Sequence, residues 1–159
     1  MQANVVLLRA IQDVMMKQGY VDIPSHGASM LPFIRTGDIC RFEPIDLSRL
    51  KKGDIVLFLD NPGRLVGHRC IGRMQSEKEA LIVCKGDSNL YPDEPVPANR
   101  VIGRMTSIRK RLIVFSTSVS WMKLWGWLVI RFPLLSRLIH MYLRTSRILR
   151  GMKKRLWTS

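Results

Sequence analysis

Short apolar runs separated by turn residues recur through the first two thirds of the chain, and this pattern constrains the fold more than any other feature. Gly-Asp and Pro-Asp pairs stand between the runs. Short runs bounded by turn formers are typical of β-strands. The runs are residues 20–24, 38–43, 54–59, 65–74, 80–84 and 100–108. Several short strands in succession predict a mainly β domain, a barrel or sandwich, over residues 20–110.

The segment before the first predicted strand has a different period. Val5, Leu8 and Met15 recur at helical spacing, and Gly19 follows as a C-cap. We therefore predict an amphipathic helix within residues 1–19. This helix is too short to form a helix-turn-helix DNA-binding head. Charged residues interrupt its apolar side and no basic segment leads it, so we do not expect a secretory signal peptide.

The basic charge of the chain is concentrated at its C-terminal end. Residues 1–94 contain 12 Lys and Arg and 12 Asp and Glu, whereas residues 95–159 contain 14 Lys and Arg and no acidic residue. The whole net charge of +14 therefore belongs to the second segment. A strongly basic segment is expected to bind either nucleic acid or an anionic lipid surface.

The composition of the same segment favours the lipid surface. After one last predicted strand at residues 112–115, residues 116–150 have a helical and strongly apolar pattern, with Pro133 as an expected kink. The apolar stretch without a charge at residues 124–130 is far shorter than the ~20 residues of a membrane-spanning helix. A pair of interfacial helices, with tryptophans at the headgroup level, fits this pattern better than a spanning helix.

We therefore expect residues 111–159 to form a basic, apolar helical tail that contacts a membrane surface through residues 116–159. The basic residues that follow the apolar part are Arg144, Arg147, Arg150, Lys153, Lys154 and Arg155. The alternative is a soluble helical hairpin packed against the β domain. Nucleic acid is not expected as a partner, because tryptophans and leucines are too abundant for a phosphate-binding arm.

The three cysteines are Cys40, Cys70 and Cys84, and no two of them have Cys-x-x-Cys spacing. This number and spacing do not predict a disulfide framework or a sulfur-ligated metal site. All three lie in apolar runs, so we expect buried thiols that pack as small hydrophobic groups. Since the chain also lacks a glycine-rich phosphate loop and a metal-binding histidine pair, we expect neither a cofactor nor a metal.

Four side chains have the chemistry of a nucleophile, its base and a carboxylate that orients the base. Ser29 lies in a loop between glycine and proline, His68 lies in the fourth predicted strand, and Asp87 and Asp93 follow the fifth. A serine hydroxyl needs a base to take its proton, and imidazole is suited to that role near neutral pH. A carboxylate on the other ring nitrogen would fix the tautomer of the base. Either aspartate can supply it, and we favour Asp87 over Asp93.

The motifs around these residues resemble those of the type I signal peptidases and their serine-peptidase relatives. His68 is similar to the base of the endoplasmic-reticulum type, which uses Ser and His, whereas the bacterial type uses Ser and Lys. The resemblance covers about residues 21–105, and no N-terminal membrane anchor of the family is recognised. The matching motifs are Gly-Ala-Ser-Met-Leu-Pro at 27–32, Gly-Asp at 37–38, Lys-Gly-Asp-Ile-Val at 52–56, His-Arg at 68–69 and Lys-Gly-Asp-Ser-Asn at 85–89.

The resemblance implies a signal-peptidase-like β barrel and a catalytic role for Ser29 and His68. It implies that Met30 and Pro32 belong to the substrate pocket, and that the backbone N–H of Ser29 donates to the oxyanion. A hydroxyl donor that some bacterial members carry two residues before the nucleophile is absent, because Gly27 occupies that position. The implied substrate is an extended peptide or preprotein segment with small residues before the cut.

We therefore expect a membrane-associated serine endopeptidase, with the cytoplasmic face favoured by the neutral β domain and the unpaired thiols. Three other hypotheses stay open. The chain could be a non-catalytic relative that acts as a binding or scaffold protein at a membrane. It could trim a peptide precursor in the cytoplasm. It could be a DNA-binding protein of the self-cleaving repressor class, although the absent DNA-binding head argues against this.

Overall fold

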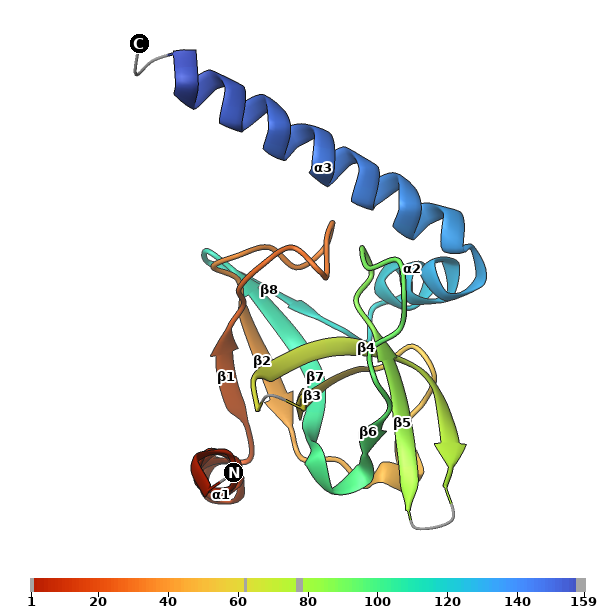
Figure 1. Cartoon of the computed structure of the whole chain (residues 1–159). Coiled ribbons are helices and arrows are strands. Elements are labelled where there is room, and N and C mark those ends of the chain that lie inside the picture. Colours follow the sequence, from red (N-terminus) through yellow and green to blue (C-terminus); the bar gives the residue numbers. More distant parts are fainter. Residues whose placement is uncertain (1, 62, 77–78, 157–159) are drawn as a thin grey trace.

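The computed structural model describes residues 2–61, 63–76 and 79–156 of the 159-residue chain. Within these residues the chain forms one antiparallel sheet that curls into a half barrel, with helices at its two ends (Figure 1). The strands are β1 Val21–Pro24, β2 Ile39–Glu43, β3 Ile55–Leu59, β4 Leu65–Gln75, β5 Ala80–Lys85, β6 Val96–Pro97, β7 Val101–Lys110 and β8 Ile113–Ser116. Short 3₁₀ helices, η1 Leu47–Arg49 and η2 Ala98–Arg100, interrupt the connections. The prediction of a mainly β domain is confirmed.

The order of the strands places β3 in the middle of the sheet. The order is β1-β2-β7-β3-β4-β5-β6, and β8 pairs with β7. All five residues of β3 are buried. Because side chains alternate between the two faces of a strand, Ile55, Leu57 and Leu59 join one hydrophobic cluster, while Val56 and Phe58 join a second cluster on the opposite face. The sheet thus separates two cores.

The N-terminal helix α1, Gln2–Gln18, packs against the first core. Ile11 and Met15 are buried there, and the helix contacts β1 and β7. Gly19 has φ +80°, and its N–H donates to the carbonyl of Met15 at 2.8 Å. This left-handed conformation costs little only for glycine, which is why the helix ends there. The predicted amphipathic helix and its C-cap are confirmed.

The sheet continues beyond Lys110, because β8 pairs with β7 from Ile113 to Ser116. Helix α2, Ser120–Arg131, then buries Met122, Gly126 and Val129. Met122 belongs to the same core cluster as Met15. The helix nearest the sheet is therefore part of its packing.

Pro133 begins a second helix and does not kink a continuous one. Helix α2 ends at Arg131, and α3 runs from Pro133 to Leu156. Proline is favoured in the first turn of a helix because the N–H it lacks would have no partner there. Helix α3 crosses above the β1–β2 loop and extends past the sheet (Figure 1). Buried Ser136 fixes its first turns, since its Oγ accepts from Lys85 Nζ at 2.9 Å.

No helix in the described part of the chain is both long enough and apolar enough to cross a membrane. Many apolar side chains of α2 and α3 are nevertheless exposed. They are Trp121, Leu124, Trp127, Phe132, Leu134, Leu138, Met141 and Tyr142. The predicted contact of the C-terminal basic side chains with a membrane lies outside the described side chains. The basic side chains concerned are Arg147, Arg150, Lys153, Lys154 and Arg155.

The three cysteines are buried and free. Burial raises the pKa of the Cys40 thiol to about 12, because the thiolate would lose its hydration. The same cause raises the pKa of Cys70 and of Cys84. The three thiols therefore pack as small hydrophobic groups, as predicted.

Candidate active site

The loop that carries Ser29 connects β1 to β2 and is fixed from inside the barrel. Its ends are joined by two backbone hydrogen bonds, from Ser25 to Asp38 and from Gly37 to Ser25. Met30 and Ile34 are each 5% exposed and anchor the middle of the loop in the first core. Ser29 stands directly before this buried anchor, so the position of its backbone is determined by packing.

A second segment holds the same loop from the other side. In the β5–β6 connection, the N–H of Ser88 donates to the carbonyl of Ser29 at 2.9 Å. The Ser88 hydroxyl donates to the carbonyl of Ala28 at 2.7 Å. Gly86 lies so close that a Cβ atom there would stand 2.8 Å from the Ser29 carbonyl oxygen. The Gly-Asp-Ser-Asn turn therefore supports the serine loop directly.

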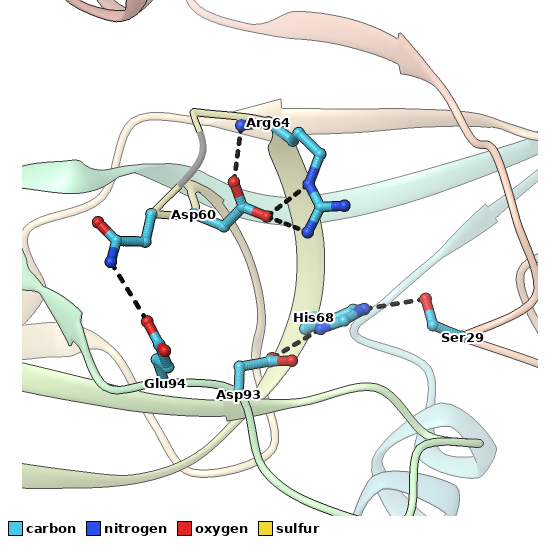
Figure 2. Close-up of polar contacts among 7 residues, drawn as sticks. Ser29, Asp60, Arg64, His68, Asp93 and Glu94 are labelled. Atoms are coloured by element: carbon cyan, nitrogen blue, oxygen red, sulfur yellow. Dashed lines mark hydrogen bonds and ion pairs between the residues drawn. The ribbon is translucent and has the colours of Figure 1, made fainter. Parts of the chain in front are cut away.

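His68 lies between Ser29 and Asp93 (Figure 2). Its Nε2 atom is 2.9 Å from Ser29 Oγ, and its Nδ1 atom is 2.7 Å from Asp93 Oδ2. His68 is 8% exposed, on a strand held by β3, where it pairs with Val56. The ring of Phe58 lies edge-on to the imidazole at 6.3 Å. The structure thus brings together three of the four residues proposed for chemistry.

The order of the contacts determines which nitrogen carries the proton. A carboxylate only accepts hydrogen bonds, so the nitrogen facing Asp93 must be Nδ1–H. In the neutral ring Nε2 is then the acceptor, and the Ser29 hydroxyl donates to it. This is the tautomer in which imidazole can take the serine proton. Asp93 is itself positioned by its backbone N–H, which donates to the carbonyl of Cys84 at 2.9 Å.

The preference for Asp87 as the partner of His68 is wrong. Asp87 is 1% exposed, and both of its oxygens accept from the Arg69 guanidinium at 2.7 Å. Trp125 of α2 adds a third hydrogen bond, from Nε1 to Asp87 Oδ2 at 3.0 Å. Neighbouring residues of a strand point to opposite faces, so His68 faces Ser29 while Arg69 faces α2. Asp87 therefore belongs to the structural side of β4.

Two of these supporting residues were not predicted from the sequence. Arg69 directly follows His68, so the two side chains point to opposite faces of the strand. An arginine on the face away from Ser29 needs a carboxylate partner there, and this was a signal in the sequence. Its Nη1 atom also donates to the carbonyl of Gly53 at 2.8 Å, and a Cβ atom at Gly126 would stand 2.7 Å from it. Trp125 had no comparable signal, because only the packing of α2 brings it to Asp87.

An apolar cavity of about 530 Å³ opens beside the Ser29 hydroxyl. Residues 23–27, from β1 and the loop after it, form one wall, and residues 65–68 at the start of β4 form the other. Met30, predicted to belong to a substrate pocket, lines this cavity together with Ile34, Cys40, Phe42, Leu57 and Met105. Pro32 is exposed and is not among the residues that line it. The prediction that Pro32 belongs to the pocket does not agree with this position.

Both walls of this cavity end in free strand edges. Strand β1 stands at the end of the sheet order, and among the residues that the structure describes it pairs with β2 alone. Residues 65–68 of β4 pair with β3, and the ladder from β4 to β5 starts only at Arg69. Unpaired N–H and C=O groups can bind an added extended segment. Residues of both edges line the cavity that also contains Ser29.

A second cavity, of about 680 Å³, lies on the α3 side of Ser29. Ser29 of the β1–β2 loop and Ser88 of the β5–β6 connection line one side of this cavity, and His140, Leu143 and Arg144 of α3 also line it. No group of three or more His, Cys, Asp or Glu side chains suited to a metal is present in the described residues.

No family model, curated protein or solved structure matches this chain. The interpretation of the site therefore depends on its geometry and on the short motifs that surround it.

Proposed function

We propose that this protein is a serine endopeptidase of the signal peptidase type that cleaves an extended peptide segment. The observation that carries the proposal is the hydrogen-bonded series Ser29–His68–Asp93 beside an apolar cavity with two free strand edges. Nucleophile and base within hydrogen-bond distance, with a third group orienting the base, are the geometric requirements of covalent acyl transfer. The motifs shared with the signal peptidases support the same conclusion.

The proposed reaction uses the three side chains in turn. Ser29 Oγ attacks the peptide carbonyl while His68 Nε2 takes the hydroxyl proton. The imidazolium then gives that proton to the leaving amine as the C–N bond breaks. A water molecule, deprotonated by the same nitrogen, releases the acyl group and restores the serine. Asp93 stabilises the imidazolium in both halves of the reaction.

The developing oxyanion needs a donor near Ser29. We expect its own backbone N–H to serve, and loss of one such donor typically costs about 3–4 kcal/mol in the transition state. Gly27 supplies no side-chain hydroxyl, and the nearby Ser88 hydroxyl is already engaged with the Ala28 carbonyl. A backbone or water donor would therefore complete the oxyanion hole.

The apolar cavity supports a choice of substrate class. A peptide paired with the edges of β1 and β4 would point alternate side chains toward the sheet. The residues that line the cavity include two histidines, His26 and His68, but no Asp, Glu, Lys or Arg. Uncharged side chains before the cut fit such a lining, and the motif resemblance narrows them to small ones.

We further propose that the protein works at a membrane surface, to which α2 and α3 attach it. Exposed Trp121, Leu124 and Trp127 on α2 and Leu138 and Met141 on α3 support this location. Tryptophans and long cationic side chains are favoured at the boundary between headgroups and acyl chains. The substrate would then be a membrane-bound precursor or a peptide delivered to that surface.

The decisive experiment combines active-site labelling with cleavage. Wild-type protein treated with a fluorophosphonate probe is expected to carry one label, and Ser29→Ala protein is expected to carry none. Ser48→Ala is the matched control, because Ser48 is an exposed serine in η1 that lines neither cavity beside Ser29. A library of extended peptides with small residues then tests turnover. Equal labelling of wild type and Ser29→Ala would contradict the proposal, and peptide binding without labelling would favour a non-catalytic binding protein.

A further inference from the structure

We propose that the groove between α2 and the adjoining surface of β3, β4 and β7 binds the headgroup of an anionic phospholipid. The inference deepens the proposed membrane association and does not depend on peptidase activity. The groove is a cavity of about 970 Å³ on the α2 side of the sheet. Ser29, His68 and Asp93 do not belong to its lining.

The lining of the groove is strongly cationic. Lys51 and Lys52 come from the turn before β3, Arg104 from β7, and Lys123 and Arg131 from α2. These positions are far apart in the sequence, so the fold gathers the charges. Arg69 also lines the groove, but Asp87 neutralises it in a buried ion pair.

The carboxylate in the groove already has partners within the protein. Asp54 is the one carboxylate among its lining residues. Its Oδ2 atom accepts from the backbone N–H of Lys51 at 2.9 Å and lies 3.8 Å from Arg104 Nη1. Lys52, Lys123 and Arg131 form no ion pair with any residue that the structure describes. Cations gathered in one concave site without counter-charges create a field that attracts an anion.

The groove also offers apolar surface next to these charges. Met122, Trp127 and Ile130 of α2 line it, and Trp127 is 56% exposed. Leu124, on the same helix, is also 56% exposed, so the apolar surface continues from the groove onto the outer face of α2. A ligand that fits both parts has an anionic head and an apolar body. An anionic phospholipid has both, whereas the phosphates of nucleic acid would leave the apolar part in water.

The experiment measures binding of the full-length protein to phosphatidylcholine vesicles with and without phosphatidylglycerol. The groove variant is Lys52→Glu with Lys123→Glu, and the matched control is Arg9→Glu on α1 with Arg49→Glu on η1, which has the same change in net charge. Both control residues are exposed and lie outside the groove. The groove variant is expected to lose affinity for phosphatidylglycerol vesicles by at least about tenfold, and the control by much less.

Each other outcome has a definite meaning. Equal losses in the two variants would show attraction to diffuse charge and would overturn the groove. Unchanged binding of the groove variant to anionic vesicles, with thermal unfolding like wild type, would overturn it as well. Binding to neutral vesicles alone would retain the proposed membrane association without the groove. Peptide cleavage in detergent, measured on the same samples, reports separately on the proposed peptidase.

Two further ligands identify the source of the anion. Short-chain dihexanoyl phosphatidylglycerol should compete with the vesicles, while glycerophosphoglycerol, which lacks acyl chains, should compete far more weakly. Equal competition by both would mean that the groove binds a soluble phosphate compound and would overturn the lipid. Duplex DNA that competes as well as the lipid, in a manner dependent on Lys52 and Lys123, would overturn it in favour of nucleic acid.

Discussion

Charged side chains form ion pairs in the sheet, whereas the cations of the C-terminal helices have no acidic residue on their own helices. Every ion pair in the described part of the chain joins residues at or before Lys110, and the buried pair of Arg69 and Asp87 is the most enclosed of them. Helices α2 and α3 contain no acidic residue, and their cations stand beside exposed apolar side chains. Buried pairs are screened little by salt, whereas exposed cations are screened strongly.

Because of this difference, the proposed peptide cleavage and the proposed lipid binding can be tested separately in one chain. Changes at Asp93 or Asp87, which lie outside the groove, should alter proton transfer or stability and leave lipid binding intact. Changes on the helices should alter lipid binding and leave turnover of a soluble peptide intact. Each prediction below either sharpens this separation or breaks it.

The largest effect is expected from Asp93→Ala. Without the carboxylate, His68 loses the partner that fixes its tautomer and stabilises its charged form, so kcat should fall about 10⁴-fold. Asp93 has a side chain that is 24% exposed, so the loss of stability should be small. Steady-state cleavage of a soluble peptide measures the first effect, and thermal unfolding measures the second. A variant that cleaves as fast as wild type would remove Asp93 from the mechanism.

Asp87→Ala should show the reverse pattern. It leaves the Arg69 guanidinium buried without its partner, and such a loss typically costs about 3–5 kcal/mol of folding free energy. Urea unfolding measures the change. The variant Asp87→Asn keeps the shape and one acceptor for Trp125, so it should be less damaging. If Asp87→Ala unfolded like wild type but lost turnover as completely as Asp93→Ala, the assignment of the two aspartates would have to be exchanged.

Removal of α3 should separate lipid binding from turnover. A chain that ends at Phe132 keeps β8, α2 and the hydrogen bond from Trp125 to Asp87. It loses the exposed apolar residues of α3 and the cations that follow, so binding to anionic vesicles should fall at least about tenfold at low salt. Cleavage of a soluble peptide should change less than this. Vesicle flotation in rising salt checks the first expectation, and full binding by the shortened chain would show that α2 suffices.

The smallest effect concerns the thiols. Because burial raises the pKa of Cys40 to about 12, the folded protein keeps its proton at pH values where the unfolded chain, near pKa 9.0, has lost it. Folding stability should therefore decrease as the pH rises above about 9. At pH 8, maleimide should react with Cys40, Cys70 and Cys84 only as fast as the protein opens. Rapid labelling of the folded protein would show that a core of the sheet is accessible.

Much of the fold was predictable because local signals agreed with one another. Short apolar runs alternate with Gly-Asp turns, and each predicted strand corresponds to an observed one with ends that differ by a few residues. Gly19 marked the end of α1 through its need for a positive φ. Pro133 was predicted to kink one helix and instead begins a second, since proline is compatible with a first turn.

The site was predictable in its nucleophile and base but not in its acid. Ser29 and His68 stand in distinctive motifs, whereas Asp87 and Asp93 both stand in turns, where aspartate is common for local reasons. Their separate roles depend on which face of β4 each one meets. That choice follows from the alternation of His68 and Arg69, together with the docking of Trp125 from a helix far along the chain. Tertiary packing alone provides this information.

The hydrogen bond between Trp125 and Asp87 has a geometric consequence. Asp87 and Ser88 belong to one tight turn. Asp87 accepts a hydrogen bond from Trp125 of α2, and Ser88 donates one to Ala28 in the Ser29 loop. These hydrogen bonds connect the helix to the loop that carries Ser29. If α2 rests on a bilayer, these contacts would hold the Ser29 hydroxyl at a set height above the lipid, and the proposed peptidase would measure distance from the membrane surface. The bond it cuts would then depend on how far the precursor rises from the surface, as well as on the side chains beside the cut.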